Sequence, residues 1–218
     1  MMRHSGSRRA LNVRKIGTAG GSMFRRLFGK REGAEQSPGA ASDPTQSHAS
    51  VKVMLQPIAG LPELRHMFIA PAPSDILRGL DGWSWLNLDG LVVIAVSAFG
   101  DLFLQAPDGT IRMLDTIGGE LREVAADLPD FAERLQDGDV RADLLLPALV
   151  EGARDTGLRL EAGECYDFRL PPVLGGEMNV EAIGKTPFVV KLDLAGQLHA
   201  QVKDLPPGTP IGGITLGE

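Results

Sequence analysis

The segment from Val92 to Asp115 alternates apolar and polar residues on both sides of one tight turn, and this pattern restricts the fold more than any other part of the sequence. Its first part, "VVIAVS", is rich in β-branched residues and lies between glycines, which is typical of a buried strand. Leu102 and Leu104 then alternate with their neighbours, "PDG" supplies a turn, and the alternation resumes at Ile111. The pattern predicts a hairpin within an antiparallel β-meander, with "GGELREVA" as the last strand.

Helical patterns lie on both sides of this meander. Before it, Ser74 is a residue type that caps helices, and apolar residues follow it at a spacing near 3.6. After it, Asp127 predicts the start of a helix that admits Pro129 in its first turn. A second helix is expected over about 140–155, with Pro147 near its start or at a kink. A meander covered by helices predicts an α+β fold in a single domain.

The last third of the chain is rich in proline and glycine. Residues 169–177, "RLPPVLGGE", predict an ordered structural loop, because the prolines restrict the backbone and the glycine pair permits a tight turn. The loop lacks both the GxGxxG and the P-loop order of a phosphate-binding segment. The run "FVVKLDL", residues 188–194, favours a strand, and "AGQLHAQVKDL", residues 195–205, fits a short helix or a strand.

Charge is distributed unevenly along the chain. Residues 1–31 hold nine of the 22 basic residues and no acidic residue. The other 13 basic residues face all 28 acidic residues, so residues 32–218 carry a formal charge of −15. A field of this sign repels nucleic acid and accelerates encounter with a basic protein. The expected partner is therefore a protein and not a nucleic acid.

Residues 1–48 are predicted to form a disordered basic leader, because they lack periodicity and contain few large apolar residues. Residues 49–218 are predicted to form the globular domain. No apolar run is long enough for a stable membrane span, a secretory signal is not apparent, and Cys165 has no second cysteine to pair with. These features favour the cytoplasm. Residues 23–31, "MFRRLFGKR", leave open a membrane-surface anchor.

Three aspartates recur at intervals of seven residues through the predicted meander, namely Asp101, Asp108 and Asp115. A calcium-binding loop needs oxygen ligands at about every second position within roughly 12 residues, closed by a glutamate. We therefore interpret these aspartates as residues of turns and strand ends, whose carboxylates bond the nearby backbone. No metal site is expected.

Candidates for catalysis are few. His199 could act as a base beside Glu164 or Asp167, but we favour a polar residue on an amphipathic helix together with Gln197 and Gln201. Cys165 is more readily explained as a small core residue than as a nucleophile. The sequence therefore predicts no catalytic residue, no cofactor and no enzymatic activity.

Three segments, residues 92–115, 160–183 and 189–211, together resemble the C-terminal domain of the type VI secretion DNase immunity proteins. The shared order is a Gly–Asp meander, a Leu–Pro–Pro–x–Leu–Gly–Gly loop and a Gln–Leu–His–x–Gln segment, spread between about Trp83 and Ile211. The resemblance implies an α+β domain that binds and neutralises a secreted nuclease toxin in the cytoplasm.

The leading hypothesis is thus a non-enzymatic binding protein whose partner is a basic nuclease toxin. Two alternatives stay open: a small hydrolase or nucleotide-modifying enzyme with His199 and Glu164 near the proline–glycine loop, and a membrane-peripheral regulator anchored through residues 23–31. The candidate partner-binding or structural residues taken from the resemblance lie in its three motifs. They are Gly100, Asp101, Leu170, Pro171, Pro172, Gly175, Gly176, Glu177, Gln197 and His199.

Overall fold

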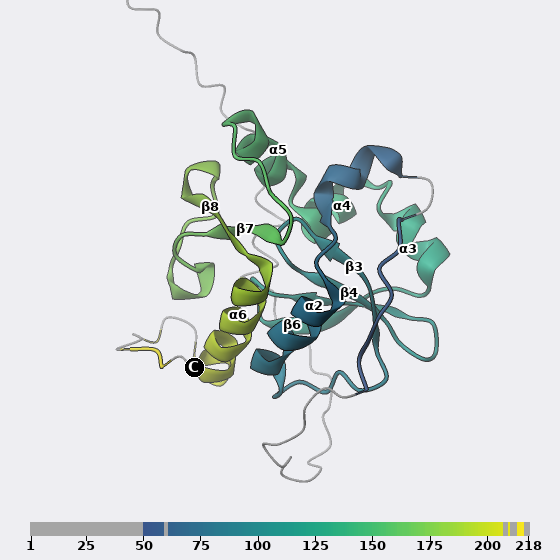
Figure 1. Cartoon of the computed structure of the whole chain (residues 1–218), viewed down its shortest axis with the longest axis horizontal. Helices are drawn as coiled ribbons and strands as arrows, with labels where there is room; N and C mark the ends of the chain where they lie inside the picture. Colours follow the sequence, from purple (N-terminus) through teal and green to yellow (C-terminus); the bar gives the residue numbers. More distant parts are fainter. Residues whose placement is uncertain (1–49, 59–60, 207–208, 210–212, 216–218) are drawn as a thin grey trace, which may run out of the picture.

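The computed structural model describes residues 50–58, 61–206, 209 and 213–215 (Figure 1). Its helices and strands form the α+β fold that the sequence predicts. The predicted leader, residues 1–48, and the candidate anchor at 23–31 lie outside the described residues. In the described part of the chain, none of the helices has the length and apolar composition of a membrane span.

The predicted meander is confirmed. Its four strands are consecutive in the chain and pair in antiparallel fashion, with the predicted hairpin at the centre. They are β3 (Val92–Ser97), β4 (Leu102–Gln105), β5 (Ile111–Asp115) and β6 (Glu120–Ala125). Two short strands extend the sheet at β3: β1 (Lys52–Val53) pairs with it in parallel, and β2 (Phe68–Ile69) in antiparallel fashion. The complete sheet is therefore mixed.

A second, two-stranded sheet is formed by β7 (Glu164–Phe168) and β8 (Ile183–Pro187), neither of which the sequence pattern predicted. The strand β8 contains Gly184 and Pro187, and both residue types are depleted in strands. The small sheet is joined to the large one by the backbone N–H of Tyr166, which donates to the carbonyl oxygen of Ala98 at 2.8 Å. This bond places β7 against the end of β3.

The helix before Trp83 exists as α2 (Pro73–Gly79), followed by the 3₁₀ turn η2 (Leu80–Trp83). Ser74 does not cap it, because the N-cap is Ala72 and Pro73 already occupies the first turn. Proline suits this position, since its fixed φ is helical and its missing N–H would have had no partner there. The other 3₁₀ turns are η1 (Pro62–Met67), η3 (Pro172–Leu174) and η4 (Val180–Ala182).

Asp127 caps α3 (Leu128–Arg134) as predicted, and its carboxylate accepts from the N–H of Asp130 at 2.8 Å. The single helix expected over 140–155 is in fact two, α4 (Gly138–Leu145) and α5 (Pro147–Asp155). Between them Leu146 adopts φ 50° and ψ 50°. The break occurs there because proline lacks an N–H and disfavours the helical conformation of the residue before it.

The strand predicted for residues 188–194 is wrong, since this run begins the long helix α6 (Phe188–Val202). The buried residues of α6 recur at helical spacing through the predicted strand and beyond it. They are Phe188, Lys191, Leu192, Gly196, Leu198 and His199. A short apolar run cannot by itself distinguish a buried strand from a buried helix, and here the longer period was decisive.

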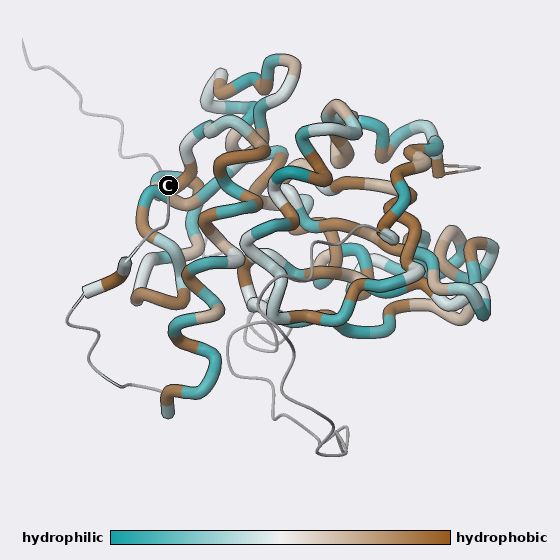
Figure 2. The backbone as a smooth tube through the Cα atoms, turned by 60° about the horizontal axis from the view of Figure 1, so that its bottom comes forward, coloured by the Kyte–Doolittle hydropathy of each residue, from teal (hydrophilic) through white to brown (hydrophobic). Residues whose placement is uncertain are grey.

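Both faces of the large sheet are buried. On one face, Ile94 and Phe103 pack toward α3, α4 and α5, and the ring of Phe103 lies 4.9 Å from that of Phe131. On the other face, Val93 packs toward α2, η2 and α6. Figure 2 shows hydrophobic residues running through the strands, while hydrophilic residues dominate the outer turns. The large sheet therefore lies between two hydrophobic clusters, and α6 and α2 lie side by side over one of its faces (Figure 1).

Candidate functional site

Asp101 connects two turns of the meander. It lies between β3 and β4, directly after Gly100, which turns the chain with φ 80°. Its buried carboxylate accepts from the hydroxyl of Ser97 at 3.0 Å and from both the N–H and the hydroxyl of Thr116 at 2.9 Å. The carboxylate therefore fixes the β3–β4 turn to the turn that follows β5.

The other two aspartates of the heptad spacing also bond the nearby backbone. Asp108 accepts from the N–H of Thr110 at 3.0 Å, and Asp115 accepts from the N–H groups of Ile117 and Gly118 at 2.9 and 2.8 Å. Hydrogen bonds from the Thr110 hydroxyl and N–H lower the pKa of Asp108. Asp108 thus acts at the β4–β5 turn, while Asp101 and Asp115 both bond the turn between β5 and β6.

Lys191 connects α6 to this corner. Its buried ammonium donates to the hydroxyl oxygen of Thr116 at 2.8 Å and to the carbonyl oxygen of Phe99. The Thr116 hydroxyl therefore accepts a hydrogen bond from Lys191 and donates one to Asp101. This hydroxyl bridges a buried cation and a buried anion. A buried charge is tolerated when it is paired and hydrogen-bonded in this way. Lys191 is not among the site residues predicted from the sequence, although a lysine within an apolar run was a usable signal.

His199 lies on the buried face of α6, not on a polar face beside Gln197 and Gln201. Its side chain is 5% exposed, its Nε2 lies 3.3 Å from the carbonyl oxygen of Thr116, and its ring packs against Trp83 at 5.9 Å between centroids. Because a carbonyl oxygen only accepts, a hydrogen bond at this contact requires the proton on Nε2. Burial lowers the pKa of His199. The ring is therefore neutral at neutral pH.

A cavity of about 370 Å³ opens where α6, the η3 loop and the turn between β5 and β6 meet, and we call it the seam pocket. Thr116, Lys191 and His199 line its inner end, and Asp167 of β7 contributes a carboxylate. Burial raises the pKa of Asp167, while the charge of Lys191 opposes this shift. Arg169 and Thr186 are the other polar residues of the lining, and the rest is apolar: Ile117, Phe168, Pro171, Pro172, Val173, Leu174, Val190, Leu194, Ala195, Leu198 and Ile214.

The seam pocket brings together several residues selected from the sequence. Pro171, Pro172 and His199 line it, and Gly100 and Asp101 lie behind Lys191. The other candidates lie away from the lining. Leu170 is 50% exposed, Gly175 ends η3 with φ 89°, Gly176 packs on the backbone of Leu170, Glu177 accepts from Asn179, and Gln197 donates to Asp193.

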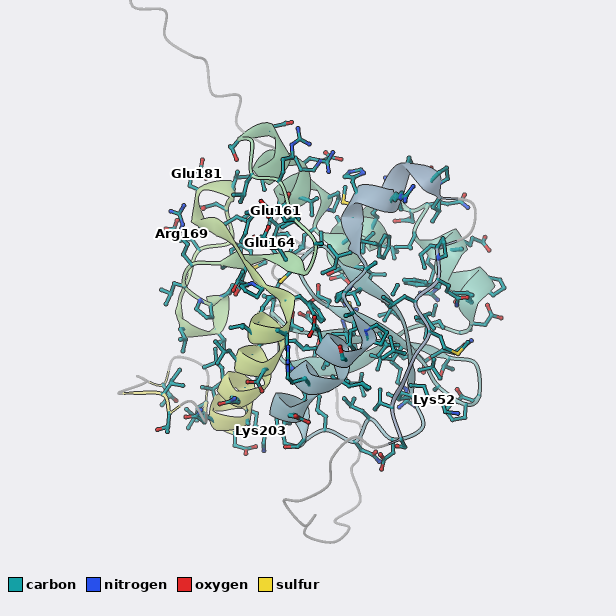
Figure 3. The ribbon with its side chains drawn as sticks, in the orientation of Figure 1. Lys52, Glu161, Glu164, Arg169, Glu181 and Lys203 are labelled. Atoms are coloured by element: carbon teal, nitrogen blue, oxygen red, sulfur yellow. The ribbon has the colours of Figure 1, made fainter. Side chains whose placement is uncertain are left out.

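Glu164 and His199 do not share a pocket. Glu164 accepts from Lys185 at 2.6 Å and lines a separate cavity of about 440 Å³ beside His66 and Arg154. Figure 3 shows Glu161 and Glu164 close together on the side of β7 toward α5. The paired acid and base required by the hydrolase alternative are therefore not formed by these two residues.

Cys165 is fully buried in the core, as the sequence analysis favoured. Burial raises the pKa of its thiol to about 12. The thiol therefore stays protonated at neutral pH, and a protonated thiol is a poor nucleophile.

The fold and the pocket define an α+β domain that carries a mainly apolar pocket where its two sheets meet. Residues 125–199 match the family described as T6SS immunity protein Tdi1, C-terminal. This match covers about a third of the chain and includes α3, α4, α5, β7, the η3 loop, β8 and α6 up to His199. It confirms the resemblance stated from the sequence over that segment, whereas residues 92–115 lie outside it. No curated protein and no solved structure matches the chain.

Proposed function

We propose that this protein is an immunity protein that binds and neutralises a toxin delivered by type VI secretion, and that the toxin is a nuclease. The observation that carries the proposal is the family match over residues 125–199. This segment supplies α6 and the η3 loop, which build most of the seam pocket. The proposed binding unit is the globular part of the chain, residues 49–218, and the proposed place of neutralisation is the cytoplasm.

The charge of the matched segment supports a basic partner. It contains 14 acidic and seven basic residues, a formal charge of −7 over residues 125–199. Nucleases contact phosphates through basic surfaces, and an acidic protein can meet such a surface with complementary charge. The association rate rises as a result, while the lifetime of the complex depends on the contacts made after docking.

Two carboxylates at the starts of α3 and α4 stay ionised at neutral pH. Hydrogen bonds from the N–H groups of Val140 and Asp139 lower the pKa of Asp137, and a hydrogen bond from the N–H of Ala126 lowers the pKa of Asp130. These carboxylates also cap or brace their helices, so their positions are fixed. Asp137 is exposed and adds negative charge to the surface, whereas the charge of the half-buried Asp130 is paired with Arg134 at 3.0 Å.

The direct test is protection in a bacterial host. Each secreted type VI toxin of the source organism is expressed without its export signal, with and without the full chain. We expect the chain to restore growth against one nuclease toxin and to leave DNA intact. Continued DNA degradation and growth arrest with every toxin, while the chain is soluble and folded, would contradict the proposal.

A further inference from the structure

One exposed apolar side chain belongs to the lining of the seam pocket, and a second directly precedes that lining in the chain. Five large hydrophobic residues of the described chain are exposed: Met54, Leu77, Leu170, Val190 and Leu205. Leu170 directly precedes the Pro171–Pro172 wall, and Val190 projects from α6 as part of the lining, with exposed fractions of 50% and 43%. Exposed apolar side chains beside a mainly apolar pocket are typical of a site of interaction with another molecule, and we call Leu170 and Val190 the rim.

From this arrangement we infer that the seam pocket is the anchor site for one large apolar side chain of the toxin, presented from a basic surface. The inference rests on the proposed function and adds the contact surface and the chemistry of the partner residue. A volume of about 370 Å³ falls in the low part of the range for binding pockets, roughly 300 to 1,000 Å³. This space accommodates a single bulky side chain.

The interior of the pocket accepts such a side chain at little polar cost. At the inner end, the ammonium of Lys191 donates to the hydroxyl of Thr116 and to the carbonyl oxygen of Phe99, and the ring of His199 bonds the carbonyl oxygen of Thr116. An entering apolar group therefore displaces water from aliphatic walls without stripping these groups of their partners. Hot-spot residues of protein interfaces are typically buried in this way, in a water-free pocket near the centre of the interface.

The wall formed by the η3 loop is held in place by hydrogen bonds within the loop. Within the η3 loop, the N–H of Leu174 and the N–H of Gly176 both donate to the carbonyl oxygen of Pro171, at 2.9 and 3.2 Å. Gly176 packs so closely on the backbone of Leu170 that a Cβ atom at this position would overlap its carbonyl oxygen. The rim therefore needs little ordering on binding, which reduces the entropy that association must offset.

The surroundings of the pocket specify the charge of the partner. Glu177 and Glu181 are exposed beside the loop, and Asp167 lies in the lining. The lining also contains Arg169, which is close in the chain to these glutamates. Figure 3 shows Arg169 and Glu181 at the outer side of the β7–β8 unit. Together with the formal charge of −7 of the matched segment, these carboxylates favour an apolar anchor flanked by lysine or arginine.

Two other occupants compete with a toxin side chain. One is the chain's own C-terminal part, since Ile214 is part of the lining and Thr215 is held to Gln201 by bonds of 3.0 and 2.7 Å. The other is a second copy of the protein. Ile214 forms part of the wall, and the cavity of about 370 Å³ is what remains with Ile214 in place. We therefore assign this remaining space to the toxin.

The test measures the affinity of the full chain for the toxin that it neutralises, by calorimetry. Leu170→Asp and Val190→Asp place a charge at the rim, and Met54→Asp and Leu77→Asp place the same charge at exposed apolar positions elsewhere. All four positions are exposed, so the fold should tolerate the changes. We expect the two rim variants to weaken binding at least tenfold and the two controls to change it less than twofold, although every variant adds attraction for a basic partner.

Equal affinity of all four variants and the wild type would overturn the anchor site and leave the proposed function intact. A wild-type chain that binds no toxin would instead remove the proposed function. A dimer in sedimentation that Val190→Asp dissociates would assign the pocket to a second copy. As an independent check, indole titrated into the ¹⁵N-labelled chain should shift the amide signals of Leu174, Val190 and Leu198. Shifts elsewhere, or none, would show that the pocket does not admit an apolar ring.

Discussion

Thr116 is the residue at which the chemistry of the seam converges. It bonds Asp101, Lys191 and His199, which come from the meander and from α6. His199 adds a pH dependence to this network, because burial lowers its pKa from the ordinary value near 6.5. An unfolded histidine still titrates near 6.5, so below this pH the unfolded chain binds a proton that the folded chain does not.

The stability contributed by the neutral ring of His199 is therefore complete above about pH 7.5 and is lost as the pH falls below about 6.5, by at most about 1.4 kcal/mol per pH unit. Urea unfolding of the wild type and of His199→Gln between pH 8 and pH 5.5 measures this loss. Glutamine can still donate to Thr116 but does not titrate, so its free energy of unfolding should fall less over this range. The same slope in both proteins would contradict the role given to His199.

A second prediction at this scale concerns Cys165. Because its thiol is buried and its pKa is raised to about 12, the folded protein should react with a thiol reagent at least roughly a hundredfold more slowly than the protein in denaturant. Colour development with Ellman's reagent gives both rates, and Cys165→Ala supplies the blank. Rapid labelling of the folded protein would show that the core around β7 opens readily.

Residue types in the sequence indicated part of this site. Asp101 was recognisable as a turn residue and the proline–glycine loop as an ordered segment, whereas His199 was expected on a polar helix face and is buried. Their meeting at Thr116 was not recognisable, since the bonds from Lys191 and His199 span 75 and 83 residues of the chain. Proximity over such separations depends on the path of α6, and α6 itself was partly misread as a strand.

At the scale of elements, the contact between α6 and η2 depends on two glycines. A Cβ atom on Gly196 would overlap the backbone of Gly82, and one on Gly82 would overlap the carbonyl oxygen of Asp193. Trp83 closes the same contact, since its indole N–H donates to the carbonyl oxygen of Leu192 at 2.8 Å. The helix and the turn therefore touch backbone to backbone, which only glycine permits here.

Gly196→Ala should accordingly lower the free energy of unfolding by about 2 to 3 kcal/mol, because backbone atoms cannot move aside as a flexible side chain can. Gly138→Ala is the matched control, since Gly138 lies in the first turn of α4 with open space around its Cα atom. There alanine should be neutral or slightly stabilising. Chemical unfolding of the three proteins compares them, and equal losses in both variants would contradict the close approach of α6 and η2.

The reliability of sequence patterns differs between the elements. The meander was predictable because tight turns and strict alternation are local features, and α3 because Asp127 supplies a local cap. The strands β7 and β8 were not, because their pairing joins residues about 20 positions apart across a loop, and Gly184 and Pro187 disguise β8. Local signals specify local structure, whereas the second sheet exists only through its partner strand.

At the scale of the whole molecule, the formal charge of −15 over residues 32–218 should govern the rate of association with a basic toxin. Raising the salt from 50 to 500 mM should slow association by about tenfold or more and change dissociation much less, because screening acts mainly on the approach. Stopped-flow mixing of the chain and toxin gives both rates. An association rate independent of salt would remove charge steering from this account.

The measurement that addresses the central claim most directly is a titration of toxin activity with the purified full chain. DNA cleavage by a fixed amount of the candidate nuclease toxin is followed as the chain is added in steps. This account predicts a linear loss of cleavage that ends at a fixed molar ratio, as expected for tight complex formation, and a much larger requirement for Val190→Asp than for Leu77→Asp. Undiminished cleavage in the presence of a large excess of the folded chain would contradict it.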